Sequence, residues 1–185
     1  KGLLMKVKNL NDYQEKTRET AIYPKIGDIY VYPILGLVGE IGEFMEKVNE
    51  ERPLVMDPSI RGELGDILWY VARTADEFNI KIEDLECPII STKNDFNYKI
   101  CSETMAIESA LLCGKIKKVF RDNEGKLNDK IKQFVFKQLQ KIYMYLFCII
   151  EYCLDYKILD VAQNNIDKLF DRKDRGVIKG DGDNR

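Results

Sequence analysis

Two pairs of acidic residues with helical spacing lie in the first half of the chain. Glu40 and Glu43 occur in the frame Gly-Glu-Ile-Gly-Glu, and Glu63 and Asp66 occur in the similar frame Gly-Glu-Leu-Gly-Asp. On an α-helix, the i, i+3 spacing places both acids of a pair on one face, about one turn apart. Like charges at this spacing repel each other, so converging acids need a cation to neutralise them. The two pairs therefore predict a metal site.

The ligands that these pairs offer are all carboxylate oxygens. The chain contains no histidine, and no cysteine lies near either pair. Hard oxygen ligands suit Mg²⁺ or Mn²⁺ better than Zn²⁺ or copper. The lack of histidine also disfavours a di-iron carboxylate bundle, whose usual motif includes histidine ligands. We therefore expect Mg²⁺, with Mn²⁺ as a possible substitute.

The acids lie on two segments with helical hydrophobic spacing, about 34–51 and about 58–78. Proline ends the first segment, and Asp57 followed by Pro58 is typical of the start of the second. A loop of about six residues between helices favours an antiparallel hairpin. This hairpin would bring the two acidic pairs together.

Three glycines recur at every third position of the first acidic segment: Gly36, Gly39 and Gly42. Each should cost about 0.5 to 1 kcal/mol relative to alanine inside a helix. Such glycines indicate close approach by another backbone or by a ligand, and tight helix packing alone would explain them equally well. We expect them to let the helices approach closely enough for the four acids to share one metal.

The remaining sequence predicts an all-α fold, a bundle of about five main helices in a single domain over residues 1–185. Further helical patterns cover about 9–20, 102–121, 128–154 and 160–172. The tyrosine-rich stretch 22–33 is expected to be a loop. A second loop is expected over 79–100; it begins with a turn of helix at 83–85 and continues as a loop or insertion at about 86–100. A Gly/Asp-rich tail follows over 175–185, of a kind that is often mobile until a ligand binds.

Composition excludes several classes of function. With 45% hydrophobic and 32% charged residues, the chain suits a helical globular protein. A net charge of −2 gives no basic field for nucleic acid, so no nucleic-acid partner is expected. The most apolar stretch, 143–154, is too short to span a bilayer and contains Glu151, so no membrane partner is expected either.

The cysteines and the start of the chain bear on location. The five cysteines are odd in number and scattered, which predicts reduced thiols and a cytoplasmic protein. Nothing at the start is typical of a signal peptide, and a first residue Lys1 suggests a fragment.

Basic residues near the ends of two predicted helices could bind a phosphate. Lys118 and Arg121 close one helix, while Asn165, Lys168 and Arg172 lie along one face of the last. Favourable placement at a helix C-terminus explains Lys118 and Arg121 equally well. Substrate binding is the better explanation for the other three, because a carboxylate-held Mg²⁺ usually has a phosphate partner.

These motifs resemble the MazG-like, all-α nucleoside triphosphate pyrophosphohydrolases, whose relatives include dimeric dUTPases, dCTP pyrophosphatase and phosphoribosyl-ATP pyrophosphatase. The resemblance rests on Glu-Ile-Gly-Glu at 40–43, followed after nineteen residues by Glu-Leu-Gly-Asp at 63–66. The endings 165–176 and 180–185 look like those of phage-type and bacterial members.

The resemblance implies hydrolysis of an NTP or dNTP between the α and β phosphates, giving the monophosphate and pyrophosphate, in nucleotide-pool housecleaning. It places Mg²⁺ between the four acids, with Glu40 or Glu43 as general base. The implied contacts to phosphates or sugar are Asn165, Lys168 and Arg172, and Tyr70 would donate a hydrogen bond to a phosphate. Gln14 and the loop tyrosines would lie near the base, although packing is the better explanation for Tyr30 and Tyr32.

The same resemblance implies a homodimer or homotetramer. Two segments depart from the family pattern, a possible extra loop at 87–98 and the long helix 128–154, and both bear on base specificity and assembly. The alternative hypothesis is a non-catalytic helical bundle that binds a protein partner and keeps its acids for solubility. It predicts that Glu40→Gln or Asp66→Asn leaves thermal stability in Mg²⁺ unchanged or raises it without metal, whereas an enzyme would lose its Mg²⁺-dependent stabilisation.

Overall fold

The structure is a computed structural model that describes residues 6–23, 30–50, 57–86, 88, 92 and 95–177. Throughout these ranges the regular structure is helical and contains no strand, which confirms the predicted all-α class. The described part has six α-helices, one for each helical segment that the sequence pattern predicts, where about five main helices were expected: α1 Leu10–Thr20, α2 Val31–Val48, α3 Ile60–Glu77, α4 Tyr98–Asn123, α5 Asp129–Phe147 and α6 Ile158–Asp174. A 3₁₀ turn, η2 Ile82–Leu85, and a π-helix, η4 Cys148–Cys153, complete the regular elements.

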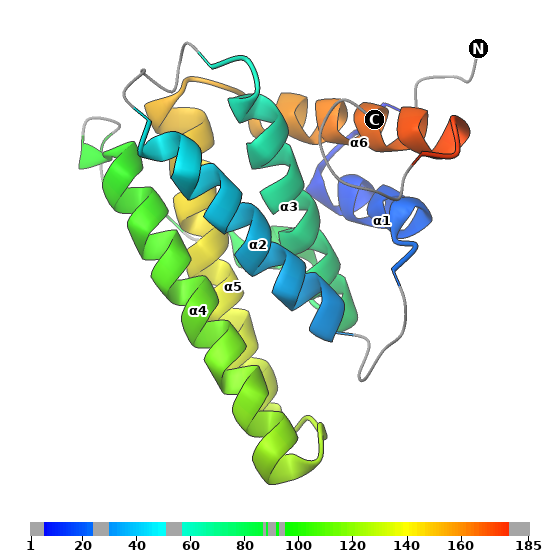
Figure 1. The fold of residues 1–185 in the computed structure, drawn as a ribbon, viewed down its shortest axis with the longest axis vertical. Coiled ribbons are helices and arrows are strands. Elements are labelled where there is room, and N and C mark those ends of the chain that lie inside the picture. The colour runs from blue at the N-terminus through cyan, green and yellow to red at the C-terminus, as the bar shows by residue number, and fades with distance from the viewer. Residues whose placement is uncertain are drawn as a thin grey trace.

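The α2–α3 hairpin lies at the centre of the arrangement. Figure 1 shows α2 and α3 side by side and antiparallel, with α4 and α5 packed along one side and α1 and α6 against the other side of α3. The inner face of α2 repeats at helical spacing and is almost fully buried, through Ile34, Leu37, Ile41, Phe44 and Val48. Burial of this face against α3 fixes how the two acidic motifs face each other.

Two helices, α2 and α4, begin earlier than predicted. α2 begins at Val31, before the predicted residue 34, and its first turn accommodates Pro33, which needs no hydrogen-bond acceptor there. α4 begins at Tyr98, before the predicted residue 102, because the Asn97 side chain accepts hydrogen bonds from the next backbone N–H groups. The predicted loops 22–33 and 79–100 are correspondingly shorter.

The second acidic helix also begins later than predicted. Asp57 does not cap it directly; its carboxylate accepts hydrogen bonds from the backbone and hydroxyl of Ser59, 2.9 and 2.7 Å away, and so holds the turn before α3. Later in the chain, α5 gives way to π-helical hydrogen bonding over Cys148–Cys153, where a continuous α-helix to residue 154 was predicted.

Other predicted features lie where the pattern placed them. The turn η2 covers the predicted turn at 83–85, and α1 begins close to the predicted residue 9, where the Asn9 side chain accepts a 2.8 Å hydrogen bond from the Asp12 backbone. Cys101 and Cys113 have free thiols, while Cys87 and the tail 178–185 lie outside the described residues. Among the described helices, none has the length and hydropathy needed to cross a bilayer.

Candidate metal centre

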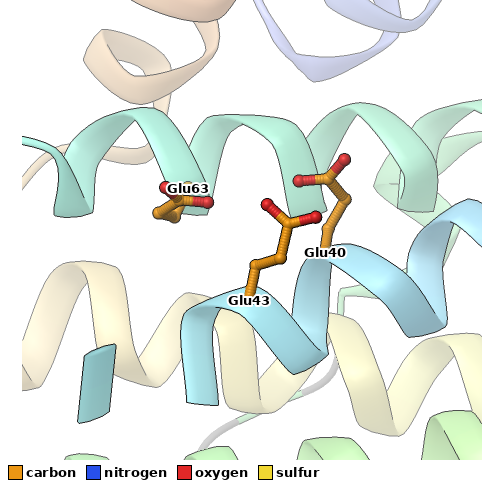
Figure 2. A group of neighbouring side chains, drawn as sticks. All are labelled: Glu40, Glu43 and Glu63. Atoms are coloured by element: carbon orange, nitrogen blue, oxygen red, sulfur yellow. The ribbon is translucent and has the colours of Figure 1, made fainter. Parts of the chain in front are cut away.

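Three of the four predicted metal ligands converge between α2 and α3. Glu40 and Glu43 project from α2 toward Glu63 on α3, as Figure 2 shows. Each can offer a carboxylate oxygen such that all three oxygens lie within 4.8 Å of one another. Glu63 is 5% exposed, Glu40 is half-buried and Glu43 is exposed. The hairpin thus forms an acidic cluster that is closed on the α3 side and open to solvent at Glu43.

Crowding of negative charge changes the protonation of Glu40. Burial is the main cause and the charges of Asp66, Glu43 and Glu63 add to it, so that the pKa of Glu40 is raised from its ordinary value to about 8. Lys168 offsets part of this rise. In the metal-free protein Glu40 therefore keeps its proton at neutral pH, which indicates a site with excess negative charge.

Asp66 lies at the edge of this cluster and contacts α6 instead. Its two carboxylate oxygens accept hydrogen bonds from Asn165 Nδ2 at 2.9 Å and from Lys168 Nζ at 2.5 Å. Asn165 is buried and accepts in turn from the Tyr13 hydroxyl at 2.9 Å. The structure thus brings Asn165 and Lys168 to the site, where they hold the fourth acid.

Arg172, the third residue predicted on α6, is 4% exposed and lies two turns beyond Asn165. The spacing of seven residues keeps it on the same face of α6 as Asn165. Its burial gives it little surface that a substrate could reach in this conformation.

A cation that was not among the predicted site residues, Lys47, lies beside the cluster. Lys47 Nζ is 2.7 Å from a carboxylate oxygen of Glu63 and 2.6 Å from the Ser59 hydroxyl. Lys47 follows Glu43 by four residues, so the helical spacing itself was the signal that could have identified it.

Comparison with known proteins agrees with this geometry. The family model described as "MazG nucleotide pyrophosphohydrolase domain" matches residues 33–89. "Gene 37 protein" of Mycobacterium phage L5 is 36% identical over 78 residues, which cover 42% of this chain and 68% of the relative. The chain belongs to the MazG-like family. No solved structure gives a significant match.

The matched MazG domain contains all four predicted metal ligands and the whole of α3. It ends before α4 and α6, so Asn165, Lys168 and Arg172 lie outside the matched range. The family assignment therefore supports a nucleotide pyrophosphohydrolase through the acidic hairpin, while the α6 contacts rest on the structure alone.

Only some of the glycines in the MazG motifs allow close packing. A Cβ at Gly36 would lie 2.1 Å from the ring of Tyr70, and one at Gly65 would lie 3.0 Å from Asn165 Cβ. At Gly39, Gly42 and Gly62, no described atom lies within 4 Å of an added Cβ. The prediction that the glycines of α2 allow close helix approach is therefore wrong for Gly39 and Gly42, which face open space.

Tyr70 belongs to an aromatic cluster beside the acids. Its ring contacts Trp69 edge-on at 4.8 Å and Tyr32 at 6.5 Å between centroids, and Tyr32 stacks on Tyr23 at 4.8 Å. The pKa of Tyr70 is raised, mainly by burial and then by the charges of Tyr32 and Glu40, so the hydroxyl stays a donor. The predicted phosphate donor is thus at the edge of the cluster.

Gln14, which lies on α1 outside the matched range, has a structural role. Gln14 is buried and donates to the carbonyls of Ala72 and Ile80, at 3.3 and 2.8 Å, while accepting from the Ile82 backbone at 3.1 Å. These bonds join α1 to the end of α3 and use both ends of the amide. The contacts of Gln14 therefore indicate a structural role and not binding of the nucleobase.

Lys118 and Arg121 lie away from the acidic cluster. Both are exposed, and Arg121 pairs with its neighbour Asp122 at 2.6 Å. The Tyr30 hydroxyl donates to Gly125 just beyond them at 2.7 Å, which places the end of α4 beside the start of α2. Glu40 lies ten residues further along α2, about 15 Å at 1.5 Å per residue.

Proposed function

We propose that this protein hydrolyses a nucleoside or deoxynucleoside triphosphate between the α and β phosphates in a Mg²⁺-dependent reaction, giving the monophosphate and pyrophosphate. The observation that carries the proposal is the convergence of Glu40, Glu43 and Glu63 within 4.8 Å inside the matched MazG domain.

The residues present fit a divalent cation. Three carboxylates meet at one point, and the raised pKa of Glu40 reflects a negative charge that a cation would neutralise. The donors of this group are all oxygen, which suits Mg²⁺ or Mn²⁺. When bound, Mg²⁺ would supply Lewis-acid stabilisation of the charge that develops on the phosphate oxygens.

The remaining chemistry is assigned to side chains of the chain itself. Glu40 or Glu43 accepts the proton of the attacking water as general base, and Glu43 is the more accessible of the two. Lys168 lies 2.5 Å from Asp66 and can provide positive charge for the phosphates. Tyr70 donates a hydrogen bond from the aromatic edge of the site.

We extend the proposal to a role in nucleotide-pool housecleaning in the cytoplasm, as a homodimer or homotetramer. The family assignment supports this role, and a row of exposed apolar residues on α4 supports self-association: Ile100 at 63%, Ile107 at 59% and Leu111 at 53%. The same row is the observation that favours the alternative, a non-catalytic bundle that binds a protein partner.

A panel of NTPs and dNTPs, incubated with and without Mg²⁺ and analysed by product separation, tests the proposed activity. The expected products are the monophosphate and pyrophosphate, only with metal, and Glu43→Gln and Glu63→Gln should remove turnover. Glu103→Gln, which changes an exposed acid on α4, serves as the matched control and should keep it. Release of orthophosphate, or no turnover by the folded protein with any nucleotide, would contradict the proposal.

A further inference from the structure

The two acids of the α3 motif, Glu63 and Asp66, are each paired with a lysine, and the two lysines come from different neighbouring helices. Lys47 of α2 lies 2.7 Å from Glu63, and Lys168 of α6 lies 2.5 Å from Asp66. Asp66 has a second donor on α6, because Asn165 also donates to it. Lys47 comes instead from the helix that carries Glu40 and Glu43.

The ammonium group of Lys47 is held at a defined position. It donates to the Ser59 hydroxyl at 2.6 Å, and that hydroxyl donates to the buried carboxylate of Asp57 at 2.7 Å. The lysine therefore bridges the acidic cluster and the turn that begins α3. Its side chain is 23% exposed, so it also borders solvent, from which a substrate must enter.

Burial of Glu63 explains why a cation is needed beside it. A carboxylate that is 5% exposed is costly unless it is paired. In the metal-free protein Lys47 provides this pairing. A divalent cation that took the same carboxylate would be within a few ångströms of the ammonium group, and two cations at that separation repel each other strongly.

We propose that Lys47 exchanges partners: it neutralises Glu63 in the metal-free protein and binds a phosphate oxygen of the substrate once a divalent cation has taken Glu63. This inference rests on the proposed function, since it assigns to the same site a residue for the β and γ phosphates that leave as pyrophosphate. The flexible four-carbon stem and three donors of lysine permit such a change of partner.

Lys47→Met tests the exchange, because it keeps an unbranched side chain only one atom shorter and removes the charge. Calorimetry gives the Kd for Mn²⁺ without nucleotide and the Kd for pyrophosphate at saturating Mn²⁺. The variant should bind Mn²⁺ at least threefold more tightly, because its competitor at Glu63 is gone. It should bind pyrophosphate about tenfold or more weakly, the size expected for loss of one charge-assisted hydrogen bond.

Lys141→Met is the matched control. Lys141 pairs with Glu108 at 2.9 Å between α4 and α5, outside the acidic cluster, so its loss should change neither Kd. Weaker binding of both Mn²⁺ and pyrophosphate by Lys47→Met would show that Lys47 only orients Glu63 and would overturn the proposal. Unchanged affinity for pyrophosphate would overturn it as well.

A crystal structure of the unmodified protein with Mn²⁺ and pyrophosphate keeps the proposal testable if Lys47→Met does not fold. Lys47 Nζ should leave Glu63 and lie within hydrogen-bond distance of a pyrophosphate oxygen, and its retention on Glu63 would contradict the exchange. The turnover assay separates the two claims. If the protein hydrolyses nucleotides but Lys47→Met does not bind Mn²⁺ more tightly and pyrophosphate more weakly, only the exchange is refuted. If Lys47→Met shows both of these changes but the protein hydrolyses no nucleotide, only the proposed function is refuted.

Discussion

Glu40 is the side chain whose charge should change most when a divalent cation binds. With a pKa of about 8, it is about nine-tenths protonated at pH 7 in the metal-free protein. A cation that uses this carboxylate must displace that proton. Binding of Mn²⁺ or Mg²⁺ at pH 7 should therefore release about 0.9 proton from Glu40, and almost none above pH 9.5.

The same pKa sets the pH dependence of metal affinity. From competition between one proton and the metal, the apparent affinity should rise about ninefold between pH 6 and 7, about fivefold between pH 7 and 8, and less than about twofold between pH 8 and 9. The chain has no histidine, which removes the side chains that normally titrate in this range. Glu40 is thus the main expected source of the released proton.

Calorimetry in two buffers of different ionisation enthalpy counts this proton directly. Titrations at pH 6, 7, 8 and 9 give the affinity series, and Glu103→Gln provides a control with unchanged behaviour. Glu40→Gln should abolish the proton release and bind metal weakly at every pH. Affinity that stays constant from pH 6 to 9, or binding without proton release at pH 7, would refute the reasoning about the crowded carboxylates.

Three further predictions concern stability and packing. Because the folded-state pKa of Glu40 lies above its unfolded value, the folded protein binds more protons than the unfolded chain between pH 4.5 and 8. The Tm without metal should therefore fall as pH rises through this window, and Glu40→Gln should make the Tm less dependent on pH. Gly36→Ala should destabilise by about 2 kcal/mol or more, since its Cβ would overlap the Tyr70 ring, whereas Gly39→Ala should stabilise by about 0.5 to 1 kcal/mol in urea unfolding. Gln14→Ala should cost about 3 kcal/mol through three lost hydrogen bonds to backbone groups, with KM unchanged in steady-state kinetics.

The acidic hairpin could be predicted from the sequence because its signals are local. Hydrophobic spacing identified both helices, the short loop indicated that they are antiparallel, and the i, i+3 spacing placed each acidic pair on one face. The convergence of Glu40, Glu43 and Glu63 follows from these three facts alone. Helix starts were less predictable, because Asn97 caps α4 from within a polar run that reads as a loop.

Contacts between distant segments could not be read from the spacing. Asp66 was grouped with the other acids, but its partners Asn165 and Lys168 lie about a hundred residues later on α6. The glycines of α2 also look equivalent in the sequence, and only packing shows that Gly36 faces the Tyr70 ring while Gly39 faces open space. Nonlocal packing decides such cases, and a single sequence does not reveal which partner each residue meets.

Anomalous diffraction from crystals grown with Mn²⁺ and a non-hydrolysable α,β-imido nucleotide tests the central claim most directly. The account predicts a Mn²⁺ peak within coordination distance of carboxylate oxygens of Glu40, Glu43 and Glu63, with the α-phosphate beside it. A nucleotide bound elsewhere on the protein, or bound with no Mn²⁺ peak between α2 and α3, would contradict it.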